Sequence, residues 1–143
     1  MMTYIGSTLH VSAGEVADTL LAYQGVTPTE VGKVVSIGRL GDMSQDVSHV
    51  LLKNGRTRRA NGALDVGEIP VVVEYDAADA GYAIILAGAN TQNVHVFKFS
   101  DADGEDRYLQ GVIANLATSE RTSSSIKTAE FTIRAQTGIT VDP

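Results

Sequence analysis

The sequence has no cysteine and no tryptophan, only three prolines, and fewer cations than anions. The absence of cysteine excludes a disulfide framework, a thiol nucleophile and a thiolate metal site. Eleven Lys and Arg against seventeen Asp and Glu give a net charge of −6, which argues against a dedicated nucleic-acid-binding protein. Apolar runs stay far below the ~20 residues of a membrane span, and the first residues lack the basic and apolar regions of a signal peptide. We therefore expect the chain to be made and to fold in a cytoplasm.

Glycine and β-branched residues are abundant, and they indicate a mainly β protein. The 143 residues suffice for one domain with its own core, residues 1–143. Fourteen glycines with many Val, Ile and Thr suit strands joined by tight turns. Alternating or continuously apolar segments predict strands over residues 4–12, 30–40, 68–75, 93–100, 107–117 and 126–135.

One helix is predicted in the segment that follows residue 75. Asp76 and Asp79 fall at its N-cap and N3 positions, where carboxylates stabilise a helix. Apolar residues at helical spacing predict a face against a sheet, and they are Tyr82, Ile85, Leu86 and Ala89, with Gly88 or Asn90 as the end. Residues 13–23 also fit one short helix, with a common face of Val16, Leu20 and Leu21.

Residues 41–67 lack a clear period, and we interpret them as a long arm between two strands. Four of the eleven cations lie in the short stretch from residue 53 to residue 59, namely Lys53, Arg56, Arg58 and Arg59. This stretch contains no acid, so the rest of the chain has seven cations against seventeen acids. A solvated loop is one interpretation. A nucleic-acid patch is disfavoured because no aromatic residues are interleaved. The third interpretation is a basic arm that meets an acidic surface of another copy, with an apolar anchor formed by Val47, Val50, Leu51 and Leu52.

The acidic residues suggest a turn and a charged surface rather than a catalytic centre. Asp101, Asp103 and Glu105 match the first three alternate positions of an EF-hand loop, but Asp106 replaces the glycine at position six and Val112 replaces the glutamate at position twelve. A solvated hairpin turn is therefore favoured over a calcium site. The candidate acids for a channel lining or an outer surface are Asp76, Asp79, Asp101, Asp103, Glu105 and Asp106.

Catalytic and cofactor motifs are absent from the sequence. His10, His49 and His95 lie on separate segments without metal-binding spacing. There is no GxSxG elbow, no GxGxxG and no phosphate-binding loop. We expect no enzyme activity, no cofactor and no bound metal.

The order of the predicted elements resembles that of a known family. It is strand, strand, basic arm, strand, helix and three strands. The resemblance lies in the stretches YIGSTLHVS, TEVGKVVSIGRLG, LLKNGRTRRANGALDVGEIPVVVEYDAADAGYAIIL and HVFKFSDADGEDRYLQGVIANLATSERTSSSIKTAEFTIRAQTGI. In these stretches the chain resembles the major tail tube proteins of long-tailed, siphophage-type bacteriophages and of related gene-transfer-agent tails.

The resemblance implies a β-sandwich or barrel with one flanking helix. It implies a structural virion protein whose hexameric rings, joined at sheet edges, stack into a tail tube that DNA passes through without specific binding. Residues 41–67, the terminal segment Met1–Ser7 and the terminal segment Thr137–Pro143 would fasten successive rings. The implied partners are other copies of the chain, and tape-measure, tail-terminator and distal tail proteins, with no membrane. An acidic excess outside the arm fits a lumen that does not retain a polyanion.

Three other classes remain as alternatives. A tail-terminator or a secretion-tube ring protein shares the implied fold, but one ring needs no long stacking arm. A carbohydrate-binding module needs exposed aromatic platforms, whereas the aromatic residues occupy expected core positions: Tyr75, Tyr82, Phe97, Phe99 and Phe131. An enzyme is the third alternative, and no constellation of residues supports it.

Overall fold

Ten strands and two short helices form the described part of the chain. The computed structural model describes residues 6–32, 34–41, 43–76, 78–118 and 127–142. The helices are α1 (Leu20–Gln24) and α2 (Ala80–Gly88). The strands are β1 (Thr8–Ala13), β2 (Thr29–Val31), β3 (Val34–Ile37), β4 (Met43–Val50), β5 (Thr57–Asp65), β6 (Glu68–Glu74), β7 (His95–Ser100), β8 (Asp106–Thr118), β9 (Thr128–Ala135) and β10 (Thr140–Asp142).

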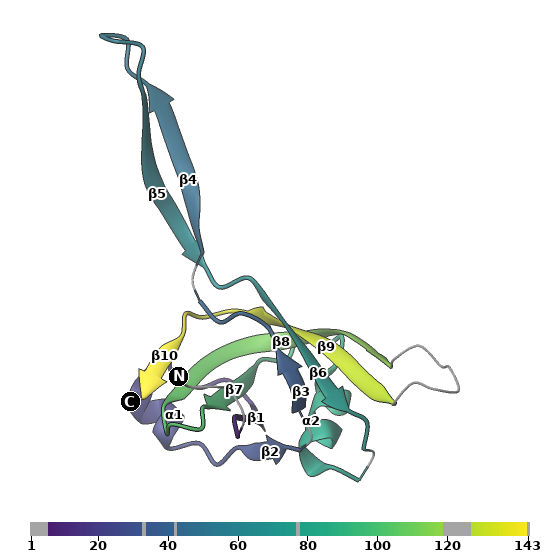
Figure 1. Ribbon diagram of the computed structural model, residues 1–143. Coiled ribbons are helices and arrows are strands. Elements are labelled where there is room, and N and C mark those ends of the chain that lie inside the picture. The colour runs from purple at the N-terminus through teal and green to yellow at the C-terminus, as the bar shows by residue number, and fades with distance from the viewer. Residues whose placement is uncertain (1–5, 33, 42, 77, 119–126, 143) are drawn as a thin grey trace.

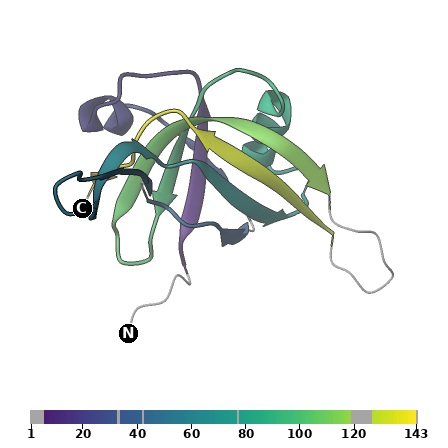
Figure 2. The same ribbon diagram turned by 90° about the horizontal axis from the view of Figure 1, so that it is seen from above.

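One antiparallel sheet makes the body of the protein, in the order β2-β1-β7-β8-β9-β6-β3, with β10 paired to β8. The two strands at the ends of this path, β2 and β3, are consecutive in the sequence. Only residues 32 and 33 separate them, a link that spans at most ~11 Å. The sheet therefore has to curl until its ends approach each other, and it does so as an open barrel (Figures 1 and 2).

The inner face of the curled sheet holds the core. In β6, for example, Ile69, Val71 and Val73 are buried there, and the residues between them are exposed or half-buried. Strands β7 and β9 contribute Phe97, Phe99, Phe131 and Ile133. The mainly β fold and the strands near 68–75, 93–100, 107–117 and 126–135 are confirmed.

Helix α2 closes one end of the barrel with Tyr82 and Ile85. Gly81 permits this approach, because a Cβ atom there would lie 2.5 Å from the carbonyl oxygen of Glu30. Leu86 was expected on the same face, but it is 57% exposed. The helix makes only about two and a half turns, so Tyr82 and Ile85 fill the contact and Leu86 points away. Gly88 ends the helix, as expected.

Two sequence expectations are wrong near the N-terminus. Residues 30–40 contain two strands rather than one, because Val31 ends a strand at one end of the sheet and Val34 begins a strand at the other end. The helix expected over residues 13–23 is only the five residues of α1, which makes a second flanking helix at the other end of the barrel (Figure 2). Among the described residues, no helix is long and apolar enough to span a membrane.

Strand β8 links the parts of the barrel. Its first half pairs with β7 on one side and β10 on the other, and its second half pairs with β9. A bulge at Asn115, which has φ +57°, bends the strand. Asn90 supports the bend, because its side-chain oxygen accepts a hydrogen bond of 3.2 Å from the N–H of Asn115.

Buried Gln110 on β8 anchors the segment that contains α1. Its side chain donates to the carbonyl of Val16 at 2.8 Å and to the hydroxyl of Tyr23 at 3.1 Å, and it accepts from the N–H of Val16 at 3.0 Å. Tyr23 also stacks on Tyr108, with ring centroids 5.3 Å apart. These contacts fix an otherwise irregular segment to the outside of the barrel.

Candidate assembly surfaces

The arm is a two-stranded hairpin that projects from the barrel (Figure 1). Strands β4 and β5 pair from Met43 with Asp65 to Val50 with Thr57, with one bulge between Ser44 and Asp46. The eight residues of β4 give a reach of ~27 Å. The sequence of residues 41–67 shows no clear period, but much of this segment forms paired strands. No core lies under this hairpin, so nothing imposes an alternation of apolar and polar residues on its strands.

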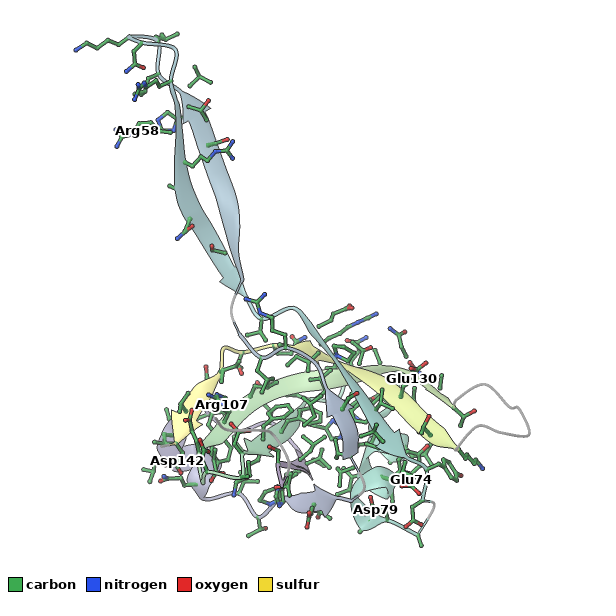
Figure 3. All side chains as sticks on the ribbon, in the orientation of Figure 1. Arg58, Glu74, Asp79, Arg107, Glu130 and Asp142 are labelled. Atoms are coloured by element: carbon green, nitrogen blue, oxygen red, sulfur yellow. The ribbon has the colours of Figure 1, made fainter. Side chains whose placement is uncertain are left out.

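The arm cations do not share one face. Arg58 lies opposite His49, and the next residue, Arg59, lies opposite Ser48. Because side chains alternate along a strand, Arg58 and Arg59 point to opposite faces, and Arg56 lies on the side of Arg58. All three arginines and Lys53 are exposed (Figure 3). The arm therefore presents basic groups in several directions.

The tip of the arm is held by its own turn. The N–H of Leu51 donates to the carbonyl of Arg56 at 2.8 Å, and the N–H of Gly55 donates to the carbonyl of Leu51 at 2.8 Å. Gly55 has φ +66°, which favours glycine. Leu52 is fully exposed at 102%, and Val50 is 59% exposed, while Leu51 is half-buried. Of the expected apolar anchor, Val47 pairs with Ala60 through its backbone, and its side chain lies outside the described part.

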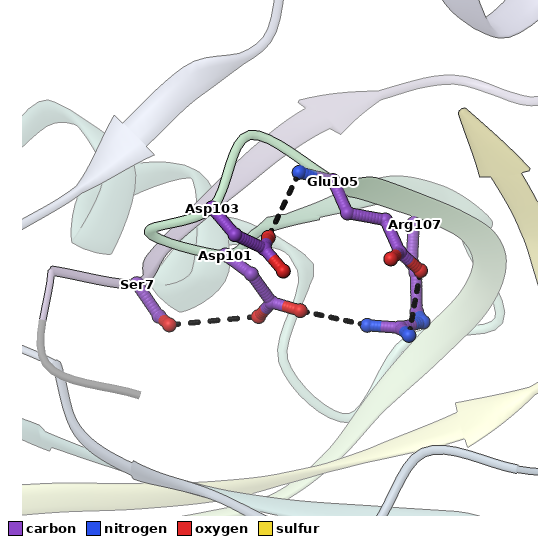
Figure 4. Close-up of polar contacts among 5 residues, drawn as sticks. All are labelled: Ser7, Asp101, Asp103, Glu105 and Arg107. Atoms are coloured by element: carbon purple, nitrogen blue, oxygen red, sulfur yellow. Dashed lines mark hydrogen bonds and ion pairs between the residues drawn. The ribbon is translucent and has the colours of Figure 1, made fainter. Parts of the chain in front are cut away.

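The turn between β7 and β8 gathers acids around one arginine (Figure 4). The guanidinium of Arg107 donates to Asp101 at 2.8 Å and to Glu105 at 2.7 Å. Asp103 accepts from the N–H of Glu105 at 3.1 Å, and Asp106 lies 3.6 Å from the ammonium of Lys98. The turn was expected to be a solvated hairpin turn, and its carboxylates are committed to cations and backbone.

Asp76 and Asp79 stabilise the start of α2, but not in the predicted positions. Asp79 is the N-cap, and its carboxylate accepts from the N–H of Gly81 at 3.3 Å. Asp76 lies before the helix and accepts from the N–H of Ala78 at 3.0 Å. The helix starts later than expected, and before it the N–H of Asp79 donates to the carbonyl of Asp76 at 3.2 Å.

The outer face of β6 and β9 carries acids that our sequence reasoning did not single out. Glu74 and Glu130 are exposed there, and Glu130 lies in register between Val72 of β6 and Ala117 of β8 (Figure 3). Glu68 on the same face pairs with Arg134 at 3.2 Å. The alternation of apolar and polar residues could have revealed these acids, because each occupies an outward-facing position of a strand whose inward-facing residues belong to the core.

The three histidines stay apart, on β1, β4 and β7. Among the described residues, no group of three or more His, Asp or Glu is arranged to hold a metal ion. His95 is buried beside α2, and its Nδ1 lies 3.1 Å from the carbonyl oxygen of Asn93. Burial lowers the pKa of His10, and the neighbouring ammonium of Lys98 adds to this, while Glu30 and Asp106 act in the opposite direction.

Comparisons with known proteins identify a shared fold, but no family that matches by sequence. No protein-family model matches the sequence, and no curated protein matches it. Solved structures do match. The tail of an empty GTA particle, refined with helical C6 symmetry, contains a chain with a TM-score of 0.67 and 10% identity, and the match covers 100% of both chains. This chain has the fold of phage-tail tube proteins.

Other structures with the tail-tube fold come from contractile injection systems. The sheath/tube terminator of the extracellular system called PVC matches with a TM-score of 0.61 and 10% identity, over 94% of this chain and 93% of that one. A chain of the anti-feeding prophage cap matches with a TM-score of 0.58 and 14% identity, over 94% and 87%. The matched chains thus come from structures of a tail, a sheath/tube terminator and a tube-terminating cap.

Proposed function

We propose that this chain is a structural tube subunit of a phage-like tail, which forms hexameric rings that stack into a tube for the passage of DNA. The observation that carries the proposal is the projecting hairpin of β4 and β5. Every side chain that the structure describes in β4 and β5 is exposed, and the exposed Leu52 at the tip gains a contact only from another molecule. The end-to-end match to a GTA tail chain supports the same assignment.

Ring formation would use the open edges of the curled sheet. Among the described strands, β2 and β3 end the pairing path, and each is short. Unpaired strand edges invite pairing with another chain, and closure of a ring satisfies them. The arm and the terminal segments, Met1–Ser7 and Thr137–Pro143, would then contact the next ring; residues 1–5 and 143 of these segments lie outside the described part of the chain. Tape-measure, tail-terminator and distal tail proteins would be the partners at the ends.

The lumen of the proposed tube would be net negative. The outer face of β6 and β9 carries Glu74 and Glu130 as exposed acids, and Arg134 on that face is paired with Glu68. A surface of this kind would not retain the phosphates of DNA during transit. The proposal assigns no catalytic residue, metal or cofactor to the chain, and it places the protein in the tail of a particle assembled in a host cytoplasm.

Electron microscopy of the purified protein at rising concentration tests the proposal. Tubes of stacked rings are the expected result. A matched variant, with residues 43–65 replaced by a short Gly-Ser linker, should keep the barrel but stop at single rings. A wild-type protein that remains monomeric at high concentration, or a deletion variant that still forms tubes, would refute the role given to the arm.

A terminator is the second candidate, because matched structures include a tube terminator and a terminating cap. A terminator would form single rings at every concentration and would bind the ends of existing tubes. The two roles therefore give different micrographs of the same wild-type sample.

A further inference from the structure

A groove opens beside the root of the arm. Its volume is about 510 Å³, and residues 34–40 line one side of it. The other side is formed by the start of β1 and by Phe99, Asp101 and Arg107 around the turn between β7 and β8. Polar and apolar groups share the lining, with Ile37, Leu40 and Phe99 among the apolar ones.

Strand β3 lies at the groove and has one strand edge that is unpaired among the described strands. Among the described strands it pairs with β6 alone, so its other edge has no strand partner there. Val35, which lines the groove, is 62% exposed. An exposed strand edge beside an apolar side chain is an unfavourable surface in a lone molecule. It becomes favourable when a second chain covers it.

The tip of the arm has complementary chemistry. Leu52 is an exposed apolar side chain on a turn whose backbone is already fixed by hydrogen bonds, so little conformational entropy is lost on docking. Lys53 follows it directly. The turn at the mouth of the groove carries four carboxylates, Asp101, Asp103, Glu105 and Asp106, against the two cations Lys98 and Arg107. Arg39 lies among residues 34–40, so Lys53 would face the acidic turn rather than the β3 side.

The arm of the same molecule does not reach its own groove. The hairpin leaves the barrel between β3 and β6 and carries its tip away from the body (Figure 1). Tip and groove are different surfaces, so a contact between them joins two copies head to tail. Contacts of this kind repeat indefinitely or close into rings, and they build extended assemblies.

We propose that the groove beside β3 receives the arm tip of a second copy, with Leu52 against the apolar lining and Lys53 against the acids of the turn between β7 and β8. This inference rests on the proposed tube function and names the surface that the arm binds. The partner is another copy of this chain.

Zero-length cross-linking of wild-type tubes tests the contact without any substitution. A carbodiimide joins an amine to a carboxylate only when they touch. Mass spectrometry should find Lys53 joined to Asp103 or Glu105 of another copy, and only in assembled material. Lys127, which is exposed beside Tyr75, serves as the internal comparison and should not join these acids. Tubes in which Lys53 joins other carboxylates but neither of these would overturn the inference.

Cysteine pairs give a second test, because the chain has no cysteine of its own. Copies carrying Leu52→Cys are mixed with copies carrying Val35→Cys, assembled and oxidised. A disulfide needs Cα atoms about 4.4–6.8 Å apart, so a covalent dimer is expected only if the tip sits in the groove. Mixing Leu52→Cys with Leu86→Cys, an equally exposed position on α2, provides the control and should give no heterodimer.

The outcomes separate the two proposals. Loss of tubes on deletion of the arm, without either cross-link in wild-type or cysteine-bearing tubes, keeps the tube function and refutes the groove. A small molecule bound in the groove of assembled tubes would also refute it. Tubes that form without the arm refute the tube-fastening role and the groove contact together.

Discussion

The carboxylate of Asp79 accepts a hydrogen bond of 2.9 Å from the N–H of Gly32. Gly32 belongs to the link between β2 and β3, where the chain crosses between the two ends of the sheet. The same carboxylate caps α2 through Gly81. One side chain therefore holds the crossing of the barrel against the start of the helix.

Replacement of Asp79 should destabilise the barrel as a whole. Asp79→Ala removes an N-cap and a second backbone hydrogen bond, so we expect a loss of ~1–3 kcal/mol in the free energy of unfolding. Asp79→Asn keeps an acceptor and should lose less. Denaturant unfolding measures both. Asp76→Ala, at the turn before the helix, is the matched control, and a loss as large as that of Asp79→Ala would contradict the role of the crossing.

Gln110 should determine whether the α1 segment stays docked. Gln110→Leu retains the approximate volume but leaves the N–H and carbonyl of Val16 and the hydroxyl of Tyr23 without this partner. Each unsatisfied buried group costs ~1–3 kcal/mol, so hydrogen exchange and proteolysis should increase over residues 16–23 before the barrel is affected. The exposed Gln136→Leu change should leave both readouts unaltered. Unchanged protection in the Gln110 variant would refute this anchoring.

The charges of the arm should control stacking but not folding. Arg56, Arg58 and Arg59 are exposed, so changing all three to Glu should leave the melting temperature nearly constant and suppress tubes. Each exposed ion pair contributes only up to ~1 kcal/mol, and repetition around a ring adds these contributions. High salt should weaken stacking in the same direction.

The register of the hairpin provides matched controls for the arm variant. Arg56→Lys with Arg58→Lys keeps the charge of one face, and Arg59→Glu alone changes the other face. Sedimentation at low salt measures the concentration needed for assembly. A triple Glu variant that sediments like the wild type would support the solvated-loop interpretation instead.

Calcium should not bind the turn between β7 and β8. Arg107 already contacts Asp101 and Glu105, so a cation would have to displace a guanidinium from two carboxylates. Isothermal titration with calcium should show no saturable heat. Arg107→Ala is the informative companion, because weak binding that appears only in this variant would show that the arginine occupies the site. Stoichiometric calcium in the wild type would contradict the prediction.

Acid should weaken the fold through His10. Its pKa is lowered in the folded protein, first by burial, and Lys98, Glu30 and Asp106 are the charged groups that act on it. The unfolded chain then takes up a proton more readily than the folded one. The stabilising contribution is complete above the ordinary pKa of 6.5 and is lost as the pH falls through that value toward the lowered one. The loss of unfolding free energy between pH 7.5 and pH 5 should be smaller in His10→Gln than in the wild type, whereas His49→Gln on the exposed arm should behave like the wild type.

The sequence predicted best those elements that bury one or both faces. The strand over 68–75 was predicted from its run of Val and Ile and the strand over 126–135 from its two-face pattern, and Val71 and Phe131 are core residues. The helix of Tyr82 and Ile85 was found for the same reason. Its first residue was misplaced because Asp76 and Asp79 are both good caps, and only the tertiary bond from Gly32 favours Asp79.

What the sequence could not give depends on contacts that leave no local period. The described side chains of β4 and β5 are exposed, so no burial imposes an apolar alternation on these strands. Residues 30–40 are divided into two strands because the sheet curls until its two ends approach each other. No local feature of the sequence marks the boundary between Val31 and Val34. The acids Glu74 and Glu130 were visible as polar positions, but their common outer face depends on the pairing of β6 with β9.

The insertion of the arm between β3 and β6 also determines how the barrel bears a mechanical load. The arm is joined to the barrel by β3, which precedes it, and by β6, which follows it. Both junctions lie at the same end of the sheet, because Ile37 and Val71 are partners and the arm lies beyond them. Strand β3 is held by three registered pairs to β6, and β6 is held by seven pairs to β9. Tension along the arm would therefore run through β6 as shear against β9, parallel to the strands. Many hydrogen bonds must then break at once, so an arm that pulls on its neighbour during bending of a tube is held by all seven residue pairs between β6 and β9 of its own subunit.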